Sequence, residues 1–481
     1  MINFTKHKFI ILLLFITLGI KLFSCLYLSC LSNCSKSEKP ISILAQKSGD
    51  APTYLDPIDN FIEKGSYFYG EGKNKTSFGR APYYGSVYYI FRLFASPNLA
   101  YDLVALSQII MESISILFLC FLSLKIISNQ FSFWLTYVLM MLSLNLTVYS
   151  NYLLTESFST SFLIIFCYYY YSYLTSKRNK YLIIAGIFLC FSTLLKPYFC
   201  LLYIPVGIGF LIEKPLKIRQ TIIKICLFVS PLILLSAPYT LRNLINYHRF
   251  LPSSELYAGA TYTKADFAYR NFVTSWGGSY IFWDKRSAGS YFQPSKDVHN
   301  EFHFPSYAIS GGYNMNDIEK VKDMYIRYQQ NPTPILEDSV YCEFNRLKNL
   351  FIKYHPFRYH FISPLIIFKQ YIFHSGSYFL PINKDFPCYK SYQLLIKISQ
   401  SILYYFTLFA GFTGLILILK SNKKTYMNLF IPILLLIMFP FVSKTTEARF
   451  FIVSYPFLII GSVCIICIYF QNFNKSKLKP C

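Results

Sequence analysis

Residues 99–127 read LAYDLVALSQIIMESISILFLCFLSLKII, a run dominated by apolar side chains. A helix needs about 20 mostly apolar residues to cross the hydrocarbon core of a bilayer, so this run is long enough to span one. Nine similar runs occur near 8–29, 131–149, 154–175, 181–195, 197–213, 224–241, 394–419, 427–443 and 450–470. The pattern predicts an all-α polytopic membrane protein with about ten transmembrane helices.

The composition of the whole chain agrees with this class. Of the 481 residues, 54% are hydrophobic and only 14% are charged, whereas a soluble domain carries about 25% charged residues. The 46 Lys and Arg residues outnumber the 23 Asp and Glu residues. In so apolar a chain, an excess of this kind is typical of cytoplasmic membrane loops. The composition therefore excludes a soluble domain and a disordered chain, and it argues against a nucleic-acid-binding protein.

Basic residues in short loops predict the orientation, because such loops stay in the cytoplasm. Five basic clusters lie at residues 6–8, 177–180, 214–224, 420–424 and 475–479. With ten spans and a cytoplasmic amino terminus, all five face the cytoplasm. We therefore expect both termini in the cytoplasm and the protein in a bacterial plasma membrane. The first run is expected to remain as an uncleaved helix, with Lys21 extending toward the membrane surface.

This topology divides the chain into three parts. Residues 1–241 form an amino-terminal transmembrane module, whose first extracytoplasmic loop covers residues 30–98. Residues 242–393 have ordinary polarity and are numerous enough to form a small extracytoplasmic domain. Residues 394–481 form carboxy-terminal membrane helices and a cytoplasmic tail. Cys342 and Cys388 both lie in the middle part, and the sequence leaves open whether they are bridged.

Charged residues at the outer ends of the runs are the candidates for function. A charge costs roughly 2.5–3.5 kcal/mol at the centre of a membrane helix, so charges near a span usually have a specific partner or task. Simpler roles also exist, since an acid at a helix start can interact with the helix dipole and a cation can bind lipid headgroups. The residues expected on the outer face are Asp50, Asp56, Asp59, Glu156, Lys196, Arg242 and Arg449.

Carboxylates and cations at one lipid–water boundary suit a group transfer from a phospholipid. A carboxylate can remove the proton from an incoming hydroxyl group. Cations, or a divalent metal held by carboxylates, can stabilise the negative charge that grows on a phosphate. Glu112, near the middle of its span, is instead a candidate for a buried hydrogen-bond partner.

Six short patterns occur in a fixed order along the chain. They are Asp50 with Tyr54, Arg80 before Ala81-Pro82, Thr155-Glu156, Lys196-Pro197, Arg242-Asn243, and Glu447 with Arg449-Phe450. This order resembles the GT-C superfamily of membrane glycosyltransferases. The similarity is greatest to the branch that contains protein O-mannosyltransferases and the lipid A aminoarabinose transferase.

The resemblance implies transfer of a sugar, with inversion, from a polyprenyl-phosphate-linked donor to a hydroxyl group of a glycan, lipid or protein on the extracytoplasmic side. It implies that Asp50 and Glu156 are catalytic, Asp50 as the base and Glu156 in orienting the acceptor or a metal. The substrate-binding residues that it implies are Tyr54, Arg80, Lys196, Arg242 and Arg449. Ala51 departs from the family pattern, so the need for a cation such as Mg²⁺ or Mn²⁺ stays open. Asp56 and Asp59 are alternative bases.

Two other functions fit a chain with this topology. A polysaccharide polymerase or ligase also has many spans and a large outer loop, but relies on loop arginines rather than on a first-loop acid. A flippase or transporter needs polar residues through the depth of several spans. Only Glu112 lies at mid-membrane depth here, which argues against a transport path.

Overall fold

The computed structural model describes residues 7–34, 42–70, 76–77, 80–212, 218–253, 263–294, 300–310, 312–374, 380–382, 390–421, 434–445 and 447–477. Within these ranges the backbone is helical, apart from turns, loops and two isolated bridges between single residues. The all-α class expected from the sequence is therefore confirmed.

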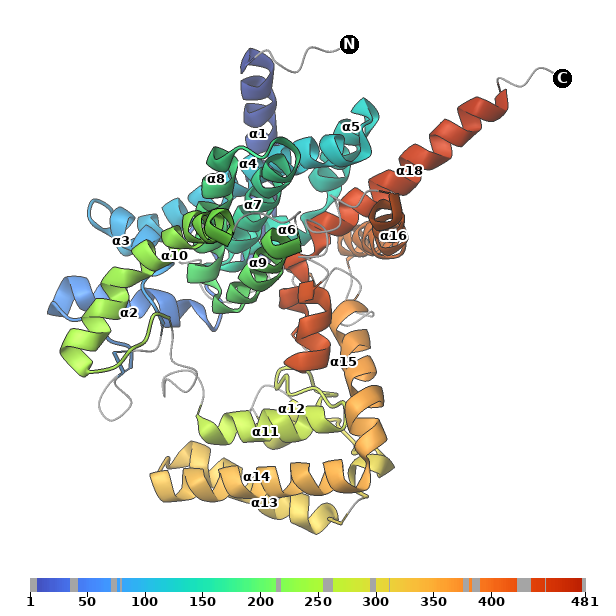
Figure 1. Cartoon of the computed structure of the whole chain (residues 1–481). Coiled ribbons are helices and arrows are strands. Elements are labelled where there is room, and N and C mark those ends of the chain that lie inside the picture. Colours follow the sequence, from blue (N-terminus) through green and yellow to red (C-terminus); the bar gives the residue numbers. More distant parts are fainter. Residues whose placement is uncertain are drawn as a thin grey trace.

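Most helices form one bundle, at the top of Figure 1. In this bundle α7 packs against α4 and α8, α8 packs against α10, and α16 packs against α18. Two short helices, α2 (Ala51–Lys64) and α3 (Gly85–Arg92), lie at its side. The helices of the bundle are α1 (His7–Cys34), α4 (Pro97–Ile127), α5 (Gln130–Leu142), α6 (Leu144–Asn151), α7 (Glu156–Ser176), α8 (Asn179–Leu195), η2 (Pro197–Leu202), α9 (Tyr203–Ile212), α10 (Ile218–Tyr247), α16 (Ser391–Ser421), η6 (Met438–Val442), η7 (Ala448–Val453) and α18 (Tyr455–Lys477).

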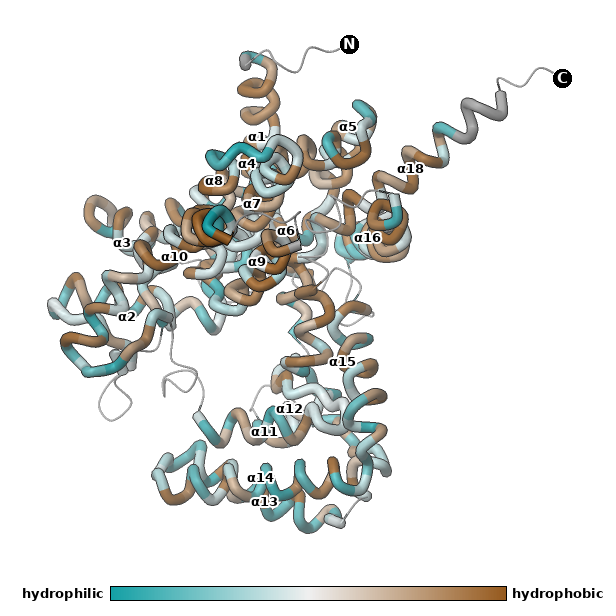
Figure 2. The backbone as a smooth tube through the Cα atoms, in the orientation of Figure 1, coloured by the Kyte–Doolittle hydropathy of each residue, from teal (hydrophilic) through white to brown (hydrophobic). Residues whose placement is uncertain are grey.

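Several of these helices have the length and composition of a membrane span. Among the described residues, α1, α4, α10 and α16 can each cross a bilayer alone, and the α5–α6 pair, bent by 51° at its break, makes a fifth candidate. α8 and residues 197–211 and 455–471 are apolar but shorter. Figure 2 shows hydrophobic residues along much of the length of these helices. The run at 427–443 is described only from residue 434, so the total of ten spans stays a prediction.

Lys21 does not extend to the membrane surface, so that expectation was wrong. Its side chain is 1% exposed, and its Nζ donates to Met140 O at 2.8 Å and to Thr147 Oγ1 at 2.7 Å. Glu112 Oε1 lies 3.2 Å from the same nitrogen, and Glu112 also accepts from Thr147 and from Ser150. Neither charge could stay buried alone. The pair therefore holds α1 against α4 and α6 as part of the bundle.

A second group of helices lies below the bundle in Figure 1. It consists of α11 (Lys264–Ser275), α12 (Ala288–Phe292), α13 (Met315–Gln330) and α14 (Pro334–Tyr354), with η3 (Ser306–Ala308). These helices share their own core of buried, mainly aromatic side chains, including Tyr269, Phe272 and Phe344. η4 (Arg358–Ile362) and α15 (Ser363–Ile372) lead back to the bundle. We call α11–α14 the outer domain.

The segment before α2 is tied to the bundle by backbone hydrogen bonds. Asp102 accepts from the N–H groups of Leu44 and Ala45, at 2.8 and 2.9 Å. Gln46 pairs with the segment just before α7, because its N–H donates to Asn151 O and its carbonyl accepts from Leu153 N. The start of α2 is therefore held near the start of α7, although about 100 residues separate them along the chain.

Three glycines allow α16 and α18 to pack closely. A methyl group added at Gly414 would overlap the carbonyl oxygen of Gly461, and one added at Gly461 would overlap that of Gly411. Close approach of this kind is typical of helix pairs in membranes. No hydrophobic driving force acts between helices in lipid, and small residues allow close van der Waals packing instead. Here it positions η7, which leads into α18.

We expect Gly414→Ala to lower the free energy of unfolding by about 1–3 kcal/mol, because the added methyl group must push the two helices apart. Gly19→Ala is the matched control, since nothing lies within 4 Å of the position that its methyl group would take on α1. That change should be neutral or slightly stabilising. Thermal unfolding of the purified protein in detergent measures both, and equal effects would contradict the packing described for α16 and α18.

Candidate active site

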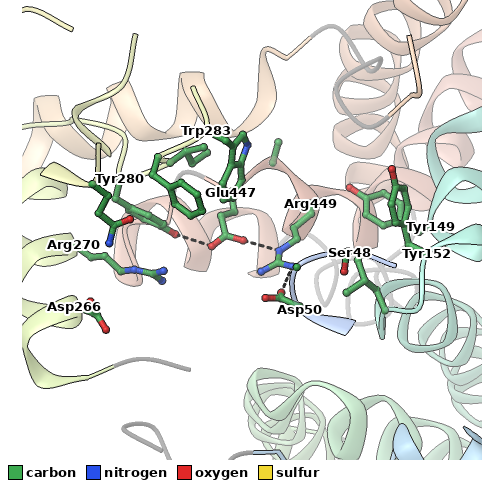
Figure 3. A pocket seen from close by; sticks show the side chains of 16 residues that line it. Ser48, Asp50, Tyr149, Tyr152, Asp266, Arg270, Tyr280, Trp283, Glu447 and Arg449 are labelled. Atoms are coloured by element: carbon green, nitrogen blue, oxygen red, sulfur yellow. Dashed lines mark hydrogen bonds and ion pairs between the residues drawn. The ribbon is translucent and has the colours of Figure 1, made fainter. Parts of the chain in front are cut away.

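Arg449 lies at the centre of a group of charges at the junction of the bundle and the outer domain. Its Nη1 donates to Asp50 Oδ2 at 2.5 Å, and its Nε donates to Glu447 Oε2 at 2.6 Å. Glu156 Oε1 is 3.9 Å from the same Nε. Figure 3 shows Arg449 between Asp50 and Glu447. One guanidinium group thus joins the first loop, the start of α7 and η7.

Asp50 precedes the first residue of α2, where an aspartate would normally cap the helix. Its side chain makes no capping hydrogen bond and binds Arg449 instead. Burial raises the pKa of Asp50, but the charges of Arg449, Arg80 and Lys196 outweigh this, and the net pKa lies below the usual 3.8. Asp50 is therefore ionised at neutral pH.

Glu156 and Lys196 form a second ion pair beside Arg449. Lys196 Nζ donates to Glu156 Oε1 at 2.9 Å, and both side chains are buried. Lys196 holds its place because Pro197 ends α8 and starts η2, so the chain turns at the carboxy-terminal end of α8. Its ammonium group also lies 5.0 Å from the ring centre of Phe450.

Several polar atoms around this pair are buried without a hydrogen-bond partner among the described residues. They are Glu156 Oε2, Thr155 Oγ1, Tyr198 Oη, Ser48 Oγ and Arg80 Nε. Leaving a buried polar group unpaired costs about 1–3 kcal/mol, so folded proteins rarely gather such atoms at one place without a ligand. The Lys21–Glu112 pair differs, because both carboxylate oxygens of Glu112 accept hydrogen bonds.

A cavity of about 550 Å³ opens beside this group. One wall comes from the bundle and the first loop, with Ser48, Asp50, Tyr149 and Arg449. The other wall comes from the outer domain (Figure 3). Its residues are Asp266, Arg270, Tyr280, Ile281, Phe282, Trp283 and Gln293. A cavity of this size suits a small ligand.

The structure brings five of the seven predicted site residues together. Beyond Asp50, Glu156, Lys196 and Arg449, Arg80 contributes its charge to Asp50 and lies 4.9 Å from the ring centre of Tyr54. Tyr54 is buried on α2 and packs edge-on against the ring of Tyr84, so it reaches the site through Arg80.

Arg242 is held apart from this group. Its guanidinium donates to Ser77 O, to Asn243 Oδ1 and to Tyr67 O, at 3.0, 2.8 and 3.3 Å. These contacts use the side chain to fix the first loop to the end of α10. Arg242 is therefore not part of the charged group around Arg449.

The two alternative bases also lie elsewhere. Asp59 binds Arg92 Nε at 3.1 Å and Tyr88 Oη at 3.0 Å, which ties α2 to α3. Asp56 is exposed on the surface of α2. Of the three first-loop acids, Asp50 is the one in contact with Arg449.

Two features of the site were missed from the sequence. Glu447 was recognised as part of a pattern but not as a site residue, although its spacing from Arg449 was a usable signal. For the outer-domain wall of the cavity, the sequence contains no pattern that would have identified the lining residues, apart from the presence of Trp283. Tyr280 Oη lies 2.7 Å from Thr445 Oγ1 and 3.4 Å from Glu447 Oε1, so the outer domain reaches the charged group directly.

The carboxylates of the site do not fit a divalent metal. Mg²⁺ and Mn²⁺ prefer several oxygen ligands with open lone pairs. Here Asp50, Glu156 and Glu447 are each bound to a guanidinium or an ammonium group. Among the residues that the structure describes, no group of three or more His, Cys, Asp or Glu side chains has the arrangement of a metal site.

Residues 87–239 match the sequence profile of a family described as dolichyl-phosphate-mannose-protein mannosyltransferase. The match confirms the resemblance over the segment that carries Glu156 and Lys196. The crystal structure of ArnT from Cupriavidus metallidurans bound to undecaprenyl phosphate is similar with a TM-score of 0.37 and 11% identity, covering 96% of this chain and 78% of that one. None of the curated proteins matches the chain.

We expect Lys196→Met to lower the free energy of unfolding by about 3–5 kcal/mol, because it leaves the buried carboxylate of Glu156 without its closest cation. The double variant Lys196→Met/Glu156→Gln should recover much of this loss, since it removes both charges. Chemical or thermal unfolding in detergent measures the free energies of unfolding of the wild type, the two single variants and the double variant, which together form a double-mutant cycle. Additive effects of the two changes would mean that the ion pair does not form.

Proposed function

We propose that this protein is a membrane glycosyltransferase that moves a sugar from a polyprenyl-phosphate-linked donor to an acceptor hydroxyl group on the extracytoplasmic side. The observation that carries the proposal is Asp50, an ionised carboxylate at the edge of a cavity, paired with Arg449 and near the buried Lys196. The family matched by residues 87–239 is described by a sugar donor of this type.

The transfer is a single displacement at the anomeric carbon of the donor. The acceptor oxygen forms a new bond to the anomeric carbon. At the same time the bond between the anomeric carbon and the phosphate oxygen breaks, and its electron pair stays on the phosphate. Asp50 takes the proton of the acceptor hydroxyl group. Attack from the face opposite the leaving group inverts the configuration. The products are the glycosylated acceptor and the polyprenyl phosphate.

Lys196 and Arg449 bind the phosphate of the donor. The single bond from Lys196 Nζ to Glu156 leaves two of its three N–H groups for a ligand, as far as the described residues show. The unpaired Tyr198 Oη and Thr155 Oγ1 can donate to the same anion. Fixed donors in a buried site stabilise the charge that develops on the leaving phosphate. Glu156 orients Lys196.

Glu447 positions Arg449 rather than taking part in the chemistry. It accepts from Arg449 Nε and lies within 3.4 Å of Tyr280 Oη, so its carboxylate is held on both sides. This leaves the Nη atoms of Arg449 directed at Asp50 and the cavity. Glu447 binds the Nε side of the guanidinium group. Removing the Glu447 carboxylate should therefore affect donor binding more than proton transfer.

We expect Asp50→Asn to lower the rate of transfer by at least about 100-fold, because an amide cannot accept the proton. Asp56→Asn is the matched control, since Asp56 is an exposed acid on the same helix. The assay supplies radiolabelled prenyl-linked monosaccharides to the purified protein and follows consumption of the donor. Full activity of Asp50→Asn would contradict the proposal and would instead favour a polymerase or ligase.

The pH profile of kcat/KM tests the role of Arg449. Because Arg449 helps to keep the pKa of Asp50 below 3.8, the base is ionised at every higher pH, and its acidic limb lies below that value. In Arg449→Gln, burial still raises the pKa and the main opposing charge is gone. The acidic limb should therefore move to higher pH. An unchanged limb in that variant would rule out Asp50 as the base.

A further inference from the structure

We propose that the outer-domain wall of the cavity is a saccharide-binding subsite, in which the ring of Trp283 stacks on a sugar of the acceptor. This inference rests on the proposed function, because it assigns the acceptor to that reaction. It deepens the function by naming the acceptor as a glycan rather than a protein or a simple lipid.

Phe282 and Trp283 are unusual because they are large, apolar and partly exposed inside a cavity. They are 42% and 44% exposed, and both line the cavity that contains Asp50. Their rings meet edge to face, with centroids 4.9 Å apart. Exposing such side chains costs free energy, and an exposed apolar surface in a cavity is typical of a ligand site.

The turn that carries these two rings is rigid. Gly289 N donates to Ser279 O at 3.0 Å, and the hydroxyl group of Ser287 donates to Ile281 O. α12 packs so closely on the turn that a methyl group added at Gly289 would overlap the backbone of Ile281. The backbone that carries the rings is therefore held in place, which reduces the entropy lost when a ligand binds.

Polar groups line the same wall of the cavity. The Arg270 guanidinium lies 4.6 Å from the ring centre of Tyr280, and Gln293 lines the cavity beside it. Ser48 Oγ, on the facing wall, is buried without a partner. A flat apolar surface with hydrogen-bonding groups at its edge matches a sugar ring, whose faces carry C–H groups and whose rim carries hydroxyl groups.

The same features disfavour the other acceptors. A lipid chain needs a continuous apolar lining, whereas this cavity contains Asp50, Glu447, Arg449 and Arg270. An extended peptide is commonly bound by adding a strand to the edge of a sheet, and the described part of the outer domain is built from helices. Trp283 and Asp50 line the same cavity from its two walls (Figure 3), so a glycan stacked on Trp283 faces the carboxylate that takes the proton.

The test is saccharide binding to the full-length protein, purified in a detergent without a sugar headgroup. Calorimetry with maltotriose, cellotriose, mannotriose and chitotriose should detect saturable binding of at least one of them. Trp283→Ala should weaken this binding about tenfold, the size of an aromatic stacking contribution, whereas Trp283→Tyr should retain most of it. Tyr341→Ala is the matched control, because Tyr341 is similarly exposed (41%) on α14, in the same domain.

Asp50→Asn separates this inference from the proposed function. It should abolish transfer but retain saturable saccharide binding, because the ring of Trp283 that stacks on the sugar does not depend on the proton transfer to Asp50. The inference is overturned if no trisaccharide binds, or if Trp283→Ala binds as tightly as the wild type. Binding of a serine-containing peptide in place of the sugars would also overturn it and would indicate a protein acceptor.

Discussion

The ion pairs of Arg449 join parts of the chain that are far apart in the sequence. Its contact with Asp50 spans 399 residues, and its contacts with Glu447 and Glu156 add η7 and the start of α7. A guanidinium can bind several acceptors in a fixed planar arrangement, which a lysine cannot. The candidate base, the candidate phosphate site and the link to the outer domain all depend on where this one group lies.

Two buried ion pairs in the bundle illustrate how a structural pair differs from a functional one. Lys21 and Glu112 are enclosed by hydrogen bonds, which Lys21 donates to Met140 and Thr147 and Glu112 accepts from Thr147 and Ser150. The Lys196–Glu156 pair leaves Glu156 Oε2 unpaired, in a buried place at the outer edge of the bundle. The first pair is complete without a ligand and serves packing. The second is incomplete, because Glu156 Oε2 can still accept a hydrogen bond and Lys196 Nζ has N–H groups left to donate to a ligand, as far as the described residues show.

The residues that line the cavity come from two parts of the chain, and each part contributes side chains of a different kind. The bundle and first loop supply charges that suit proton transfer and phosphate binding. The outer domain supplies aromatic rings on a rigid turn, and Tyr280 ties it to Glu447. The proposed acceptor subsite and the proposed phosphate site are therefore connected through the contacts of Tyr280 with Glu447 and of Glu447 with Arg449.

Much of the membrane part was predictable from local patterns. The apolar runs marked where the bundle helices lie, because each span must satisfy its own backbone in lipid. The charges at their outer ends identified Glu156, Lys196 and Arg449, since a charge beside a span needs a partner. The expectation for Lys21 failed, because a side chain long enough to reach the surface can equally turn inward to a carboxylate.

The sequence by itself determined the all-α class and the residues that carry charge at the outer edge of the bundle, because both follow from the cost of placing polar groups in lipid. Only the tertiary structure decided which charges meet. It selected Asp50 over Asp56 and Asp59, set Arg242 apart, and placed Trp283 opposite Asp50. These outcomes depend on contacts between residues hundreds of positions apart, and no local pattern specifies the distance between such residues.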